Sequence, residues 1–317
     1  MDLSIIIVNW NACKVLHDCL ASIRNSCGAL EVEIFVVDND SIDGSREMVE
    51  RDFPEVHLIN SGSNMGFGKA NNLAIPQAKA PYVFFLNPDT IVKQNTLEKM
   101  CAFLDNNPET GLIGCKMIDA EGYPAELPLQ MEATPFKRLL LQLFFTNKSA
   151  NIIESVFPSH NPLESGYLKN LYGACLMVRK KVLDEVGYFD EQFFMYAEDV
   201  DLCQRIYKKG WKIYYMSEVD IIHLEGKASD KAPKEFSIVT MCDSICKLMF
   251  KNYGIKGKII YRFGVFISSC LRLPIIFFLR GVDIATGKKN QEKYKQSCYK
   301  HKIMLKWSLA SSKLIQR

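Results

Sequence analysis

The 317-residue sequence lacks several features that would place it in a common class of protein. Its eleven cysteines stand singly, with no CxxC pair and no short disulfide-framework spacing, which is typical of reduced thiols in a cytosolic protein. The start of the chain has no basic region, and its apolar run Ser4–Val8 is too short for a signal peptide. We therefore expect the active part in the cytosol. Internal repeats and low-complexity segments are also absent.

Neither sign of charge dominates, with 39 Lys and Arg against 36 Asp and Glu. A near balance gives no overall field for a polyanionic partner, and no nucleic-acid recognition motif is present, so a nucleic-acid-binding protein is disfavoured. Residues 9–25 lack the basic, glycine-rich phosphate loop that a nucleotidyltransferase usually carries early in the chain. With 48% hydrophobic residues, the chain can form one large domain with or without an accessory segment.

Short apolar runs that end in polar turns mark buried strands in the first half of the chain. They are Leu3–Val8, Glu33–Val37 and Tyr82–Leu86. Continuous apolar runs of this kind are typical of parallel strands covered on both faces. The alternation of strands with helices predicts an α/β sheet whose ligand sites lie along the carboxyl edge. The elements between and after these runs are helices at Val15–Asn25, Gly44–Arg51, Asn64–Ala74 and Thr96–Leu104, and a short strand at His57–Asn60.

The second half continues this pattern after a less regular region. Prolines interrupt residues Glu121–Glu164, where a short surface helix is predicted at Leu139–Phe145. We place the end of the main domain at residue 235. The ordered elements before that boundary are a strand at Asn170–Arg179, helices at Lys180–Val186 and Asp199–Lys208, and strands at Trp211–Met216 and Val219–His223.

The chain changes character from residue 236 to residue 317. Ile259–Arg280 is strongly apolar but contains Arg262, Arg272 and Pro274. A spanning helix needs ~20 mostly apolar residues, and an arginine near its middle costs roughly 2.5–3.5 kcal/mol. We expect a helical, membrane-associating segment, with an amphipathic helix pair packed on the domain as the alternative. The lysines that follow suit an anionic cytoplasmic leaflet, and they are Lys288, Lys289, Lys293, Lys295, Lys300 and Lys302.

Polar residues at the ends of two strands are candidates for binding a nucleotide. Asp38 and Asn39 follow a buried strand, where open α/β sheets bind ligands, and such groups accept hydrogen bonds from a base or a ribose. Trp10, beside Asn9 at the end of the first strand, is placed to stack on the base. The alternatives are that Asp38 caps the next helix and that Trp10 is a core aromatic residue.

Two further positions are candidates for holding a metal ion. Asn87-Pro88-Asp89 ends an apolar strand, and a carboxylate there suits Mg²⁺ or Mn²⁺, although an Asx-Pro turn gives the same pattern. His223 follows the strand that ends the second half of the domain. It is either a metal ligand or an ordinary surface residue.

Three carboxylates, Glu198, Asp199 and Asp201, begin a predicted helix. We expect the helix dipole to keep them ionised at neutral pH, as a general base requires. Ordinary capping of the helix N-terminus is the alternative. The aromatic run Phe189–Tyr196 just before them gives this turn apolar walls and a surface for a sugar.

Taken together, in this order and spacing, these motifs resemble the inverting family 2 glycosyltransferases of GT-A fold, particularly the bacterial rhamnosyltransferase-like branch. The resemblance covers roughly residues 1–230 and implies a Rossmann-like mixed sheet flanked by helices. The motifs are SIIIVNWN at 4–11, VVDNDSIDGS at 36–45, NMGFGKANN at 64–72, FFLNPDT at 84–90, GACLMVRKKVLDEVGYFDEQFFMYAEDVDLCQR at 173–205 and HLEG at 223–226.

The resemblance implies transfer of a sugar, such as rhamnose, from a dTDP-, UDP- or GDP-sugar. The implied acceptor is a glycan or a polyprenyl-diphosphate-linked oligosaccharide of surface polysaccharide synthesis, at the cytoplasmic face of the plasma membrane. The alternatives are a nucleotidyltransferase and a non-catalytic nucleotide-sugar-binding scaffold. A scaffold would be expected to lose the base or the metal carboxylate, and this chain retains both.

The resemblance also implies a role for each candidate residue. Asp199 matches the catalytic base with Glu198 beside it, and Asp89 with His223 matches the metal ligands. Three positions depart from the family pattern, because asparagine replaces an aspartate at 87 and at 39 and a phosphate-contacting arginine at 71. The implied donor-nucleotide residues are Asn9, Trp10, Asp38, Asn39, Asn64 and Gly66, and the acceptor or sugar residues are Asn87, Asp201 and Tyr196.

Overall fold

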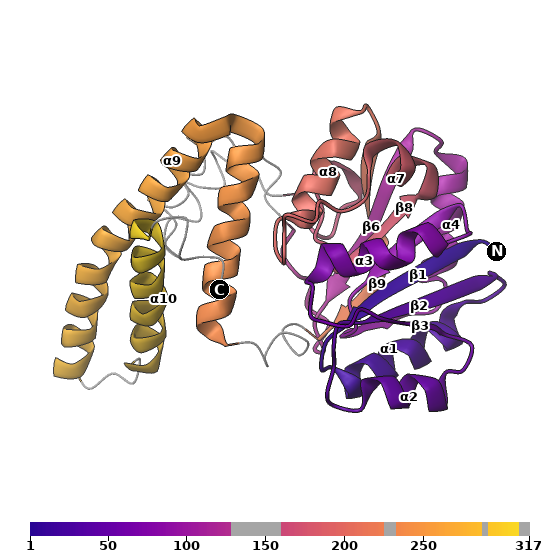
Figure 1. Cartoon of the computed structure of the whole chain (residues 1–317), viewed down its shortest axis with the longest axis horizontal. Helices are drawn as coiled ribbons and strands as arrows, with labels where there is room; N and C mark the ends of the chain where they lie inside the picture. Colours follow the sequence, from indigo (N-terminus) through magenta and orange to yellow (C-terminus); the bar gives the residue numbers. More distant parts are fainter. Residues whose placement is uncertain (128–159, 225–232, 287–290, 311–317) are drawn as a thin grey trace. The chain divides into compact units, whose positions relative to one another are not determined.

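The computed structural model describes residues 1–127, 160–224, 233–286 and 291–310. The helix predicted at Leu139–Phe145 lies outside the described residues. The chain divides into two compact units, of which the first contains the described residues up to 224 and the second those from 233 onward. The first unit is an α/β sheet with helices, and the described part of the second is formed by helices (Figure 1).

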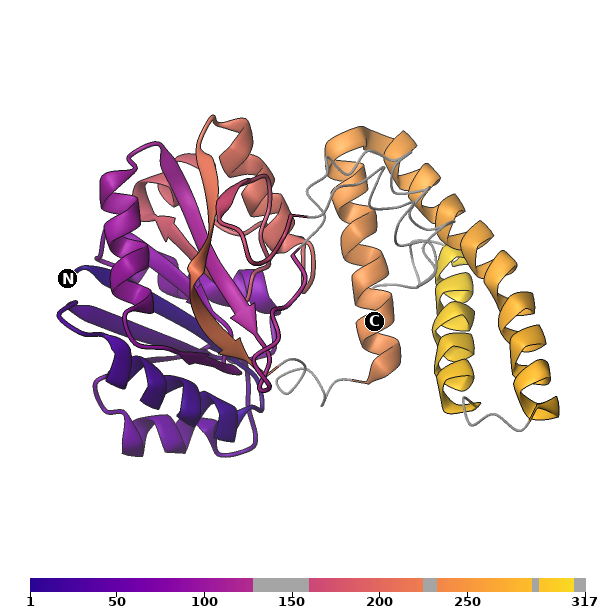
Figure 2. The same cartoon turned by 180° about the vertical axis from the view of Figure 1, so that it is seen from behind.

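The first unit is built on one nine-stranded mixed sheet in the order β3-β2-β1-β4-β8-β6-β9-β5, with β7 paired to β9. The four strands β1 to β4 run parallel, β8 is antiparallel to its neighbours β4 and β6, and β9 is parallel to β6 (Figures 1 and 2). In chain order the strands are β1 (Leu3–Asn9), β2 (Val32–Asp38), β3 (His57–Asn60), β4 (Tyr82–Leu86), β5 (Thr90–Val92), β6 (Thr110–Ile118), β7 (Gly166–Leu168), β8 (Cys175–Arg179) and β9 (Lys212–His223).

Helices cover both faces of the sheet, so alternate side chains of a strand enter two different cores. In β1, Ile5 and Ile7 join the core beneath α1, whereas Ile6 and Val8 join the opposite core. This burial on both sides explains why β1 is a continuous apolar run and not an alternating one. One face carries α1 (Cys13–Ser26), α2 (Ser45–Asp52) and α4 (Thr96–Asn106), and the other carries α3 (Phe67–Ala74), α7 (Lys180–Val186) and α8 (Glu198–Lys208), with a short 3₁₀ helix at Ile75–Gln77.

The predicted mixed α/β sheet with flanking helices is confirmed, and three strands were not foreseen. These are β5, β6 and β7. The strand predicted from Asn170 begins only at Cys175. The two strands predicted at Trp211–Met216 and Val219–His223 are one strand, β9, because the β6–β9 register shifts between Cys115 and Lys116 and leaves a bulge in β9 at the polar residues that looked like a turn.

The second unit consists of α9 (Lys234–Ala285) and α10 (Gln291–Leu309), so the predicted helical tail is confirmed. Gly254, at φ 63° and ψ −156°, divides α9 into two arms. α10 runs antiparallel to the second arm: Arg280 Nε donates to Gln291 Oε1 (3.1 Å) at one end, and Arg262 Nη2 donates to Ser308 O (2.9 Å) at the other. Trp307 Nε1 donates to Asp243 Oδ1 (2.7 Å) and thereby ties α10 to the first arm.

Candidate functional site

The polar side chains at the ends of β1 and β2 form a buried hydrogen-bond network. Asn9 lies opposite Asp38 in the parallel register, and its Nδ2 donates to Asp38 Oδ1 (3.2 Å) and to Ser41 Oγ (3.1 Å). Asp38 Oδ2 accepts from Ser41 N (2.9 Å) and lies 3.6 Å from Arg46 Nε. The next helix, α2, has Gly44 as its N-cap, so Asp38 shapes the loop and does not cap that helix.

Asn39 connects this network to the start of α3. Its Nδ2 donates to Asn64 Oδ1 and to Gly66 O, each at 3.1 Å, while its Oδ1 accepts from Met65 N (3.0 Å). An ionised aspartate has no donor for these two acceptors, so the asparagine at position 39 makes two hydrogen bonds that an aspartate could not make. Five of the six predicted donor residues are therefore brought together, and Trp10 lies half-buried directly after Asn9.

Asp89 and His223, which are far apart in sequence, meet at one edge of the sheet. β5 pairs antiparallel with β9 so that Thr90 lies opposite His223, and Leu224 N donates to Asp89 O (2.9 Å). His223 Nε2 lies 3.4 Å from Asp89 Oδ1. A carboxylate and an imidazole together fit a divalent ion such as Mn²⁺. No group of three His, Cys, Asp or Glu side chains suited to a metal occurs among the described residues.

At the start of α8, Glu198 is buried and Asp199 is half-buried. Gly173 N donates to Asp199 Oδ2 (2.9 Å), and Val200 N donates to Asp199 Oδ1 (2.7 Å). A side chain at position 173 would crowd this contact, because its Cβ would lie 3.2 Å from Asp199 Cβ. The N-cap of α8 is Ala197, which makes no side-chain capping bond, so neither carboxylate is the N-cap residue.

The prediction that the helix dipole keeps these carboxylates ionised at neutral pH is wrong for Glu198. Burial, together with the neighbouring Asp199 charge, raises the pKa of Glu198 to about 8. Burial also raises the pKa of Asp199, although the N–H groups of Gly173 and Val200 act in the opposite direction. Loss of hydration here outweighs the dipole. A carboxylate with a raised pKa is a better proton acceptor, which suits a general base.

Two hydrogen bonds donated by backbone N–H groups connect the Asp89 turn to the support of Asp199. β4 pairs antiparallel with β8, and beyond the last pair Asn87 N donates to Ala174 O (3.1 Å). Ala174 directly follows Gly173, whose N–H holds the Asp199 carboxylate. The half-buried Asn87 is therefore a structural link between the two sides of the site as well as a candidate sugar contact.

The segment before α8 is held against α3 in a strained conformation. Tyr196 and Ala197 both adopt the left-handed region, at φ 69° and 67°, which side-chain-bearing residues rarely occupy in succession. Phe67 N donates to Phe194 O (2.9 Å), and Asn72 exchanges two hydrogen bonds with the backbone of Phe189 (2.9 and 3.0 Å). These contacts maintain the turn that presents Tyr196 and the two carboxylates.

Asp201, predicted to contact the acceptor, is buried against Arg205. The distance from Arg205 Nε to Asp201 Oδ2 is 2.8 Å. The Arg205 guanidinium also donates to the carbonyl oxygens of Val186, Gly187 and Tyr188, so this pair fixes the loop that follows α7. A direct role for Asp201 toward an acceptor stays a prediction.

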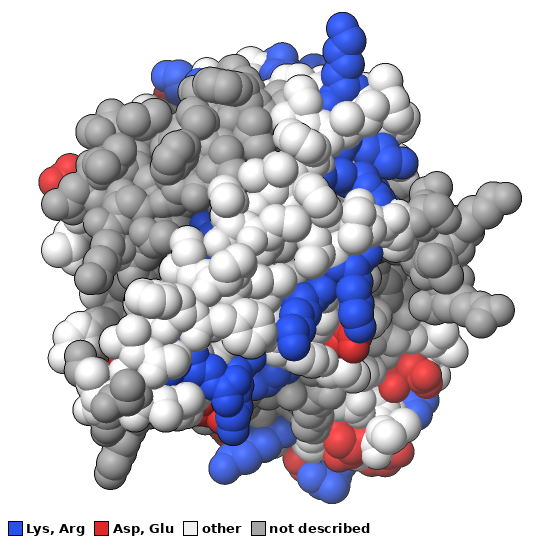
Figure 3. All heavy atoms as spheres, turned by 90° about the vertical axis from the view of Figure 1, so that its left-hand side faces the viewer, with Lys and Arg blue, Asp and Glu red and all other residues white. Residues whose placement is uncertain are grey.

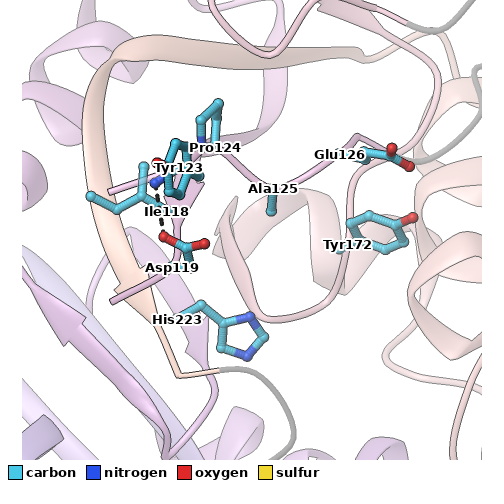
Figure 4. Close-up of a pocket in the computed structure, with 8 residues that line it drawn as sticks. All are labelled: Ile118, Asp119, Tyr123, Pro124, Ala125, Glu126, Tyr172 and His223. Carbon is cyan, nitrogen blue, oxygen red and sulfur yellow. Dashed lines mark hydrogen bonds between the residues drawn. The ribbon is translucent and has the colours of Figure 1, made fainter. Parts of the chain in front are cut away.

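Sequence reasoning missed a cavity of about 420 Å³ beside His223. It also assigned no role to Gly173 or Asn72, although both lie within the quoted motifs. The position of Gly173 just before an apolar strand was the only local sign of its role. The cavity had no signal, because its walls come from separate segments; its lining residues are Ile118, Asp119, Tyr123, Pro124, Ala125, Glu126, Tyr172 and His223 (Figure 4).

The family described as Glycosyl transferase family 2 matches the chain over residues 4–187. The N-acetylglucosaminyl-diphospho-decaprenol L-rhamnosyltransferase of Mycobacterium tuberculosis is 29% identical over 218 residues, which cover 64% of this chain and 69% of that protein. Rhamnosyltransferase WbbL of Escherichia coli is 26% identical over 170 residues, covering 51% of this chain and 62% of WbbL.

A solved structure with the same fold is the mannosyltransferase PcManGT from Pyrobaculum calidifontis in complex with GDP-Man and Mn²⁺. The TM-score is 0.58 at 14% identity, with 97% of this chain and 86% of that chain covered. The likeness confirms the predicted GT-A-type fold.

We predict that Gly66→Ala destabilises the first unit by at least about 3 kcal/mol. Gly66 has φ 85°, and an added Cβ would lie 2.0 Å from Phe194 O. The segment before α8 would therefore have to move away from the start of α3. Gly62→Ala is the matched control, because Gly62 has φ 75° but no atom within 4 Å of an added Cβ. It should cost only about 1–2 kcal/mol. The free energy of unfolding of both variants is measured by urea denaturation. An equal decrease in Gly66→Ala and Gly62→Ala would contradict the proposed contact.

We predict that stability falls as pH rises from about 4.5 to about 8, and that Glu198→Gln makes this fall shallower. Unfolded, the Glu198 carboxyl ionises near its ordinary pKa of 4.5; folded, it keeps its proton up to a pKa of about 8. Between these values the folded chain binds more protons, so the free energy of unfolding decreases with pH. Glutamine has no proton to lose. Melting temperatures across this pH range test this, with the exposed Glu50→Gln as control; a Glu198→Gln profile parallel to wild type would refute it.

Proposed function

Because the chain belongs to glycosyl transferase family 2, we propose that it transfers a sugar from a nucleotide-diphosphate sugar to an acceptor hydroxyl with inversion at the anomeric carbon. The observation that carries this proposal is that three features lie at the same end of the sheet. They are a buried polar network, the Asp89–His223 pair and the Asp199 carboxylate, which backbone N–H groups hold. The names of the rhamnosyltransferases from M. tuberculosis and E. coli support rhamnose as the sugar and a glycan or polyprenyl-diphosphate-linked acceptor.

The donor is held at the carboxyl ends of β1, β2 and β4. Asp38 and Asn39 offer oxygen acceptors and an amide donor for a base and a ribose, and Trp10 offers a ring beside them. Asp89 and His223 are the residues that would hold Mg²⁺ or Mn²⁺, which when bound neutralises charge on the leaving diphosphate. Selection among dTDP-, UDP- and GDP-sugars rests on this network.

Asp199 is the proposed general base. Gly173 N donates to Oδ2 of Asp199 and Val200 N donates to Oδ1, so the orientation of the carboxylate is fixed. Each oxygen keeps a lone pair that can accept from the acceptor hydroxyl. Asp199 takes the hydroxyl proton while the oxygen attacks the anomeric carbon from the side opposite the leaving group. Glu198, whose Oε2 is buried without a hydrogen-bond partner among the described residues, stands beside it to contact the acceptor or shape the site.

We predict that Asp199→Asn lowers kcat by roughly 10²–10⁴-fold, because an amide cannot accept the proton. Nucleotide binding should be retained, since Asp199 does not belong to the donor network. Release of nucleotide and formation of glycosylated product are measured together. The exposed Asp18→Asn on α1 is the control and should keep wild-type turnover. Near-normal turnover in Asp199→Asn would refute its role as base.

The second unit supports attachment to the membrane surface. Within the described part of the chain, α9 is the one helix long and apolar enough to cross a membrane by length and composition. Figure 3 shows this side of the molecule as a pale, uncharged band with Lys and Arg gathered beside it. The second arm of α9 exposes a stripe of apolar side chains mostly four residues apart, namely Ile255, Ile259, Phe263, Leu271, Ile275, Phe278 and Val282.

We propose that this arm lies in the membrane interface and does not span it. Arg262 and Arg280 bind α10 at opposite ends of the arm, so the two helices would have to enter the bilayer together. α10 carries five lysines between residues 293 and 306, and each charge at the bilayer centre costs roughly 2.5–3.5 kcal/mol. An in-plane hairpin avoids that cost and brings basic groups to anionic headgroups on the cytoplasmic face.

We predict that the full chain floats with vesicles of anionic phospholipid and is released by high salt or alkaline carbonate. Replacing both Ile275 and Phe278 by Glu should weaken partitioning at least about tenfold, because burying one such side chain contributes about 1.5–3 kcal/mol. Ile42→Glu, at a 90% exposed residue of the first unit, is the control. Retention of the wild-type protein after carbonate washing would favour a spanning helix and contradict the in-plane arrangement.

A further inference from the structure

The cavity beside His223 is walled by a preformed turn after β6. Asp119 Oδ1 accepts from Glu121 N (3.0 Å) and Tyr123 N (2.8 Å), and Asp119 N donates to Tyr123 O (2.9 Å). Ala125 N donates back to Met117 O (2.8 Å), so the chain beyond the turn is held along β6. Hydrogen bonds within the chain therefore fix this wall, as is usual for small-molecule sites, which are largely preformed.

The cavity lies between the proposed metal ligands and the support of the proposed base. One wall is His223, whose imidazole pairs with Asp89. Another is Tyr172, which directly precedes Gly173, the residue whose N–H holds Asp199 (Figure 4). A molecule in the cavity therefore lies beside both the leaving-group side and the base side of the site.

The lining residues favour a neutral, hydroxyl-rich ligand. Asp119 and Glu126 supply carboxylates, which accept hydrogen bonds from hydroxyl groups, and no Lys or Arg is among the described residues that line the cavity. Tyr123 is 70% exposed and Tyr172 is 44% exposed, so two aromatic rings offer apolar surface to the face of a sugar ring. The volume of about 420 Å³ is in the range of pockets that hold small ligands.

We infer that this cavity binds the neutral sugar ring of the acceptor, with Tyr123 and Tyr172 packing on the ring and Asp119 and Glu126 accepting from its hydroxyls. The inference rests on the proposed glycosyl transfer and adds residues that determine acceptor specificity. Any diphosphate of the acceptor lies outside the cavity, because the two carboxylates repel it. Asp201, one of the three residues that the resemblance implies for the acceptor or sugar, forms an ion pair with Arg205.

The test uses the full chain with Mn²⁺ and dTDP, and measures binding by saturation-transfer NMR. The probes are the methyl glycosides of glucose, galactose, N-acetylglucosamine and rhamnose, with glucose 1-phosphate as the charged counterpart. Wild type should bind at least one neutral glycoside. Tyr123→Ala and Tyr172→Ala should weaken its binding roughly three- to tenfold. Tyr207→Ala, at a 45% exposed tyrosine of α8, is the matched control and should not.

The variant Glu126→Lys provides a second test, in which the expected result is a gain of binding and not a loss. Reversing this exposed charge should improve binding of glucose 1-phosphate relative to the neutral glycosides. The inference is overturned if wild type binds no neutral glycoside, if the two tyrosine variants bind like Tyr207→Ala, or if wild type prefers glucose 1-phosphate. Binding of dTDP is recorded in the same samples, so a failed donor site is distinguished from a failed acceptor pocket.

Discussion

The site depends on two hydrogen bonds donated by backbone N–H groups near the junction of β4 and β8. Asn87 N donates to Ala174 O, and the adjacent Gly173 N donates to the Asp199 carboxylate. The first bond fixes the turn that carries Asp89, and the second fixes the proposed base. Both N–H donors lie just beyond the antiparallel β4–β8 pair, so the sheet contributes to positioning the metal side and the base side. Side-chain packing around them then has only to exclude water and shape the pockets.

Burial is the second constraint, and it determines the charge state of the site. Glu198 and Asp199 lie at a helix N-terminus, which favours ionised carboxylates, yet their removal from water raises the pKa of both. The strained pair Tyr196 and Ala197 belongs to the same arrangement, since the segment is held there by α3. The structure thus trades some stability near neutral pH for a carboxylate that accepts a proton readily.

Much of the first unit was predictable, because strands buried on both faces leave continuous apolar runs and end in polar turns. That signal located β1, β2, β3 and β4 and the residues after them. β6 was not predicted because Gly111 and Gly114 interrupt its apolar run. β9 was predicted as two strands because its bulge resembles a turn. The meeting of Asp89 with His223 followed from family resemblance, since no local pattern links residues so far apart. The cavity and the raised carboxyl pKa values depend on burial by distant segments, which sequence patterns do not encode.

The central claim is that the network of Asp38 and Asn39, with Asp89 and His223, forms a metal-dependent nucleotide site. The most direct measurement is a thermal-shift panel of UDP, dTDP and GDP, each with and without Mn²⁺ or Mg²⁺. A ligand at 100 times its Kd stabilises the fold by about 2.7 kcal/mol, which is readily detected. We predict that one nucleotide raises the melting temperature in the presence of metal, and that Asp89→Asn removes the metal dependence. No shift with any nucleotide under any metal would contradict the claim.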